Sequence, residues 1–105
     1  MSIYNPDVWE VLELSISEDE AVRKVFAGWY GGWAGSDSWK LSSMINKVTE
    51  TETHYEFLCE SGSTYRCNKG SQKMSGYMCS IYSGWIEEAK KEGAMKIIVV
   101  EGKLT

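Results

Sequence analysis

The chain is poor in the residues that most catalytic and metal-binding motifs require. Its 105 residues include one histidine, one proline and three cysteines. Cys59, Cys67 and Cys79 lack the C-x-x-C or C-x-x-H spacing of a zinc site, and an odd number does not suit a disulfide framework. We therefore expect reduced, mostly buried thiols, with no metal and no cofactor.

Long apolar runs are also absent. The longest, Ile97–Val100, is far shorter than the ~20 residues of a membrane-spanning helix, and the opening MSIYNPDVWE has neither the basic nor the apolar part of a signal peptide. These features predict a cytoplasmic protein with no membrane partner. The net charge of −4 argues against nucleic-acid binding, which needs a concentrated basic surface. The length predicts a single domain, residues 1–105.

No G-x-S-x-G, P-loop, G-x-G-x-x-G or H-E-x-x-H motif occurs in the sequence. His54 lies in a polar segment, Thr51–His54, which indicates a solvated strand residue rather than a general base. The acidic residues alternate along a polar hairpin or lie on the outer side of a helix, as Glu87, Glu88 and Glu92 do, and both patterns are typical of solvated faces. The sequence does not predict an enzyme.

The first half of the chain predicts strands. Val8–Ile16 is rich in β-branched and aromatic residues at period two. Residues 17–30 leave two alternatives open: Ser17–Glu20 matches a helix capping box, but Val22–Tyr30 is dense in β-branched and aromatic residues. We favour a strand, with Ser17–Glu20 as the tip of a hairpin. A further strand is expected over residues 39–48.

The next segment predicts a hairpin formed by Thr53–Cys59 and Ser63–Cys67. A three-residue loop, residues 61–63, pairs Cys59 with Tyr65 and Phe57 with Cys67. This odd loop length places five apolar side chains on one face, whereas an even length scatters them. The set consists of Tyr55, Phe57, Cys59, Tyr65 and Cys67. Both cysteines are therefore expected in the core.

The clearest element is an amphipathic helix. Eight residues follow helical spacing without a break: Met74, Tyr77, Met78, Ile81, Tyr82, Trp85, Ile86 and Ala89. Ser71 or Ser75 offers an N-cap, and Gly93 is the expected residue after the C-cap. A last strand, Met95–Glu101, has an unbroken apolar centre that predicts cover on both faces. The predicted fold is α+β: a twisted antiparallel sheet of five or six strands packed on one long C-terminal helix.

The most unusual stretch is WYGGWAGSDSW, residues 29–39. Its glycines predict a bend between two strands. Asp37, between two serines, is expected to brace the turn by side-chain-to-backbone hydrogen bonds. The alternative is an aromatic, acidic surface that binds a partner's apolar side chain, a sugar or a base. That candidate site consists of Trp29, Tyr30, Trp33, Ser36, Asp37, Ser38 and Trp39.

Three runs in the chain resemble short uncharacterised proteins of bacterial phages, integron cassettes and other mobile elements. They are Lys24–Gly32, Gly35–Ser43 and Ser61–Cys67. The resemblance implies a compact single domain of bacterial or phage origin. It carries no activity and no site residue over to this chain.

These observations lead to a hypothesis of a non-enzymatic binding protein, an accessory protein of a mobile element, that acts through residues 29–40. The partner would be a host protein or a small ligand. One alternative is a phage or mobile-element inhibitor of a host defence enzyme, and the least favoured is a small enzyme that pairs a cysteine with His54. Five tryptophans and six tyrosines exceed the needs of a core this size, so a homodimer is a further partner arrangement.

Overall fold

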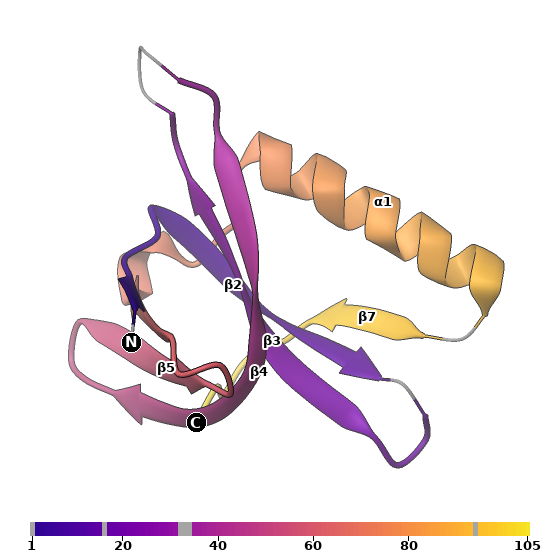
Figure 1. Ribbon diagram of the computed structural model, residues 1–105, viewed down its shortest axis with the longest axis horizontal. Coiled ribbons are helices and arrows are strands. Elements are labelled where there is room, and N and C mark those ends of the chain that lie inside the picture. Colours follow the sequence, from indigo (N-terminus) through magenta and orange to yellow (C-terminus); the bar gives the residue numbers. More distant parts are fainter. Residues whose placement is uncertain (1, 16, 32–34, 94) are drawn as a thin grey trace.

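A computed structural model describes residues 2–15, 17–31, 35–93 and 95–105 of the chain. Over these residues the fold is α+β, with one seven-stranded sheet and one long helix (Figure 1). The elements are β1 (Ile3–Tyr4), β2 (Val8–Ser15), β3 (Ala21–Trp29), β4 (Ser38–Glu50), β5 (His54–Cys59), β6 (Thr64–Asn68), a 3-10 turn η1 (Lys69–Ser71), α1 (Gly76–Glu92) and β7 (Lys96–Val99).

The order of strands in the sheet is β1-β6-β5-β4-β3-β2-β7. The α+β prediction and the C-terminal helix are confirmed. The predicted details of the sheet are wrong on two points, because it has seven strands and is mixed. The short strand β1 runs parallel to β6 at one edge of the sheet. It has only two residues, too few for a sequence pattern to predict a strand.

Residues 21–29 form a strand, as favoured over the helical alternative. β3 lies between β2 and β4 and pairs with both. Its apolar residues are used on two faces of the sheet, because Val25 and Ala27 pack in one core and Phe26 in the other. Ser17 and Glu20 close the β2–β3 hairpin through two backbone hydrogen bonds of 3.4 Å. The tertiary pairing therefore outweighs the local helix signal at Ser17–Glu20.

The strand β4 bends the sheet. It pairs with β3 up to Met44 and with β5 from Ile45 onward, and the register shifts on both sides of this point. At the bulge, Ser42 is buried and its hydroxyl accepts a 2.8 Å hydrogen bond from the Val25 amide. The side chain therefore supplies the acceptor for Val25 where the strand ladder is interrupted. Figure 1 shows β4 curving from one half of the sheet into the other.

The β5–β6 hairpin confirms the odd loop, with a register two residues from the predicted one. Phe57 pairs with Tyr65 and Tyr55 with Cys67. The loop consists of residues 60–62, and it is closed by a hydrogen bond from the Cys59 amide to the Ser63 carbonyl. Gly62, in this loop, takes a positive φ of 92°. A shift of two residues keeps every side chain on its face. Cys59 and Cys67 are buried, as predicted.

The helix begins and ends as its sequence predicts. The Ser75 hydroxyl accepts a 3.2 Å hydrogen bond from the Met78 amide, and Gly93 takes a left-handed φ of 65°. The prediction for the last strand is wrong. β7 is an edge strand paired only with β2, and Ile98 is 41 % exposed on the face away from the helix. After β7, the chain enters another part of the core, where Val100 and Leu104 are buried.

The sheet separates two cores. One, here called the concave core, lies where the sheet curls over itself: the rings of Trp9 on β2 and Phe57 on β5 are 5.6 Å apart, although β3 and β4 lie between their strands. The other, the helix-side core, lies between the sheet and α1. The concave core comprises Trp9, Val11, Val25, Ala27, Phe57, Cys59, Tyr65, Cys67, Val100 and Leu104. The buried residues of the helix-side core are Val8, Leu12, Phe26 and Met78.

Candidate functional site

The candidate site lies on the β3–β4 hairpin, which extends away from the body of the sheet (Figure 1). Three side-chain-to-backbone hydrogen bonds hold the start of the connection. The Tyr30 amide donates to the Asp7 carboxylate at 2.9 Å, and the Gly31 amide donates to the Asp37 carboxylate at 3.1 Å. The Trp29 indole donates to the Asn5 carbonyl at 3.1 Å. The loop is therefore held at its base from both sides.

Two of the predicted binding residues pack against the cores, one against each. Trp29 is half-buried against the concave core, with its ring 6.2 Å from that of Tyr4. Trp39 is half-buried on the helix side, 5.2 Å from the ring of Trp85. The two indoles thus contact different cores. That both take part in binding stays a prediction.

Asp37 braces the loop, as predicted, through the Gly31 amide on the opposite side of the connection. The bond requires a close approach of the two sides: a Cβ on Gly31 would lie 2.5 Å from backbone atoms of Gly35 and Ser36. Glycine is therefore needed at position 31. Asp7 was not found by sequence reasoning, since it lies 23 residues from Tyr30 and only the folded chain brings them together.

The remaining predicted residues are exposed. Tyr30 is 51 % exposed, and Ser36 and Ser38 are also on the surface. Trp33 lies outside the described residues. Among the described residues of the candidate site, the exposed ones are Tyr30, Ser36, Asp37 and Ser38.

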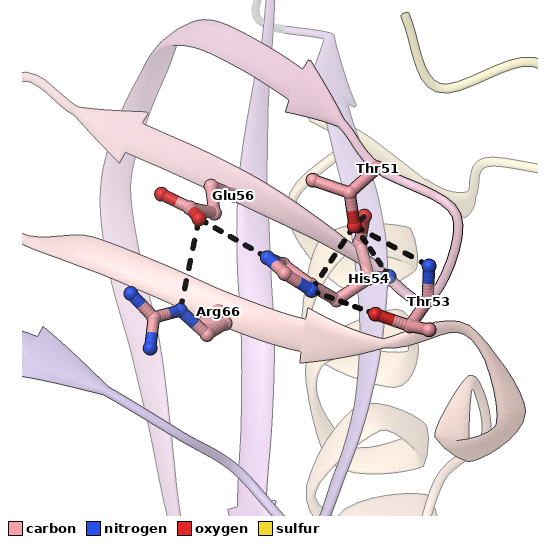
Figure 2. Close-up of polar contacts among 5 residues, drawn as sticks. All are labelled: Thr51, Thr53, His54, Glu56 and Arg66. Carbon is pink, nitrogen blue, oxygen red and sulfur yellow. Dashed lines mark hydrogen bonds and ion pairs between the residues drawn. The ribbon is translucent and has the colours of Figure 1, made fainter.

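A polar cluster surrounds His54 on the outer face of β5 (Figure 2). His54 is half-buried, more than predicted, and its Nε2 lies 3.1 Å from the Glu56 carboxylate, which is also 3.7 Å from Arg66. Its Nδ1 lies 3.1 Å from the hydroxyls of Thr51 and Thr53.

The order hydroxyl, imidazole, carboxylate resembles a nucleophilic triad, but the Thr51 hydroxyl is committed to its own turn. It accepts from the amides of Thr53 and His54 and donates to the His54 carbonyl. A hydroxyl so engaged is a turn brace. The cluster therefore stabilises the β4–β5 connection.

The two core cysteines are poor nucleophiles. Burial raises the pKa of the Cys67 thiol far above its ordinary value and also raises the pKa of Cys59. Both thiols are therefore protonated at neutral pH, and they point away from the face that carries His54. Cys79 is exposed on α1. The described residues contain no group of three or more histidine, cysteine or acidic side chains placed to hold a metal ion.

Over the same part of the chain, α1 is neither long nor apolar enough to cross a membrane. Comparison of the sequence and structure with protein-family models, curated proteins and solved structures gives no match. The function has to be argued from the site itself.

Proposed function

We propose that this protein is a non-enzymatic binding protein that engages a partner protein through the β3–β4 hairpin, with Tyr30 as the central contact. The observation that supports the proposal is a ring 51 % exposed on a connection held at its base by three hydrogen bonds. A residue whose backbone is already held, as Tyr30 is by Asp7, loses less conformational entropy on binding, and tyrosine offers a large contact area with few rotatable bonds.

Asp37 adds an acidic group beside this ring, and Ser36 and Ser38 add exposed hydroxyls. Such a mixture of one aromatic ring and several polar groups is typical of protein-binding loops. The resemblance to mobile-element proteins suggests that the partner is a bacterial host protein, which would make this an accessory protein of such an element.

The experiment uses a photo-crosslinking amino acid in place of Tyr30, with the same probe at Tyr77 as a matched position. Tyr77 is also exposed, at 43 %, but lies on α1. We expect a discrete adduct in bacterial lysate from the probe at position 30 only. Unlabelled wild-type protein and Tyr77→Ala should compete for that adduct equally well, whereas Tyr30→Ala should compete poorly.

The proposal is wrong if Tyr30→Ala competes as well as the wild type, or if both probes give the same adduct. Replacement of either exposed tyrosine should change stability by no more than about 0.5 kcal/mol, so circular dichroism and thermal unfolding separate loss of contact from loss of fold. Asp37→Ala removes the brace and leaves Tyr30 in place. It should weaken competition about fivefold, which corresponds to one lost hydrogen bond.

A further inference from the structure

A hollow of ≈ 240 Å³ lies between the last turns of α1 and the sheet. Its walls are apolar side chains from β2, β4, α1 and β7, and its only acidic residues come from the helix. The lining residues are Leu12, Leu14, Leu41, Trp85, Glu88, Ala89, Glu92, Met95 and Ile97. We call this hollow the helix cleft.

Ala89, whose side chain is small, lines the helix cleft on the α1 side. Ala89 and Met95, together with Ile97, also line a second hollow of ≈ 590 Å³ beside the helix. Ala89, in the last turns of α1, therefore lines both hollows. Towards its start the helix is seated by Met78, which is fully buried against Val8 and Phe26. Both hollows are lined by the C-terminal half of α1.

The helix cleft has a negative rim. Glu88 and Glu92 are one helical turn apart, so their side chains lie on the same face of α1. Neither forms an ion pair with another described residue. The hollow of ≈ 340 Å³ beside the concave core differs in this respect: of its charged residues, Glu13 is paired with Arg23 at 3.2 Å and Lys47 is a cation.

The aromatic wall of the helix cleft is Trp85. Its ring packs against those of Phe26 and Trp39, with ring centroids 5.1 and 5.2 Å away. An indole packed in this way offers a flat apolar surface for another ring, and it attracts a nearby cation through its π-face.

We propose that the helix cleft binds a small arylalkylamine, a molecule with one aromatic ring system and one ammonium group. The ring would lie among Leu12, Leu41 and Trp85, and the ammonium group would meet Glu88 and Glu92. The size agrees: an engineered cavity of about 150 Å³ holds benzene, so ≈ 240 Å³ takes a single or fused ring with a short arm. This inference does not rest on the function proposed for the β3–β4 hairpin.

The test is a titration of the full chain with tryptamine, followed by amide chemical shifts. Indole-3-propionate is the matched probe, since it has the same ring and arm with a carboxylate in place of the ammonium. We expect tryptamine to bind with a dissociation constant on the order of 0.1–1 mM and to shift the amides of Leu12, Leu41, Ala89 and Ile97. The propionate should bind at least about tenfold more weakly.

Variants then test separately the contribution of the two carboxylates and that of the volume of the helix cleft. Glu88→Gln combined with Glu92→Gln should weaken tryptamine about tenfold at low salt, because two exposed charge contacts are lost. Glu87→Gln is the matched control, on the same helix but outside the lining, and should bind as the wild type does. Ala89→Leu fills the hollow with a good helix former and should abolish binding while the fold is retained.

Four outcomes of the titrations would overturn the proposal. These are equal binding of the two probes, shifts that map away from the helix cleft, no binding up to the solubility limit of the amine, and unchanged binding by Ala89→Leu. If the cleft amides instead shift with protein concentration alone, the occupant is a second copy of the chain, and the proposal is again wrong. Tyr30→Ala should bind tryptamine normally, so failure here is distinguishable from failure of the hairpin proposal.

Discussion

The two cores are made from alternate residues of the same strands. In β2, Trp9 and Val11 face the concave core, whereas Val8 and Leu12 face α1. Ten residues are buried in the concave core and four on the helix side, where nine further apolar residues are only half-buried. The reason is geometric: a curled sheet surrounds its own concave face with strands, but a single helix covers only a stripe of the opposite face.

This difference suggests a division of roles. The concave core should account for most of the stability, because more apolar side chains are fully buried there. The helix-side core keeps apolar surface partly open and contains the helix cleft. Four predictions test this division, beginning with the largest expected effect.

The first compares two phenylalanines, each 0 % exposed, one in each core. Phe57→Ala should cost close to 5 kcal/mol and Phe26→Ala close to 3 kcal/mol, the two ends of the usual range of about 3–5 kcal/mol. The half-buried Trp39 and Trp85 can move into the space left by Phe26, whereas strands surround Phe57. Urea unfolding measures both, and an equal or reversed cost would refute the division.

The second concerns the one tight contact of the helix side. A Cβ on Gly28 would clash with the Met78 sulfur and lie 3.3 Å from Val8. Gly28→Ala should therefore destabilise the fold by about 1–3 kcal/mol, because a packed α1 must shift. In a double-mutant cycle with Met78→Ala, the cost should largely disappear. If the two changes add without coupling, α1 is not seated on Gly28.

The third uses pH. Burial raises the pKa of Tyr65 from its ordinary value of 10.0 to about 12, and it raises the pKa of Cys67 above its ordinary value of 9.0 by even more. At alkaline pH the unfolded chain therefore ionises both groups, whereas the folded protein keeps them neutral. Their contribution to stability is full below pH 9 and is lost as pH rises through the folded values, at about 1.4 kcal/mol per pH unit for each group.

The measurement is urea unfolding at rising pH. Cys67→Ala should make the fall in stability above pH 9 less steep, because one titrating group is removed. Cys79→Ala, which removes a thiol on the surface of α1, is the matched control for loss of a cysteine outside the concave core. A wild-type stability that does not fall with rising pH would contradict the burial of these groups in the concave core.

The fourth and smallest effect concerns the start of α1. Ser75→Ala removes the cap on the Met78 amide and should cost about 1 kcal/mol. Ser80→Ala is the control, since its exposed hydroxyl only contacts the Gly76 carbonyl within the same helix, and it should be neutral or slightly stabilising. Thermal unfolding distinguishes the two, and a neutral Ser75→Ala would mean that packing alone holds the helix start.

The candidate site was only partly predictable. The reversal of the chain between β3 and β4 and the bracing role of Asp37 follow from local chemistry, and both are present. The separation of Trp29 and Trp39 into different cores depends on Tyr4 and Trp85, which lie far away in the chain. Glu88 and Glu92 look like solvated helix residues in the sequence. Only the position of α1 over the sheet places them on the rim of the helix cleft.

The amino-acid sequence by itself determined the elements that depend on near neighbours. The cap at Ser75, the left-handed Gly93 and the shared face of Tyr55, Phe57, Cys59, Tyr65 and Cys67 all follow from spacing within a few residues. The tertiary structure alone decided the parallel strand β1, the edge position of β7 and the curl at β4. These depend on which distant strands pair, and a pattern of alternation is the same whichever partner a strand finds.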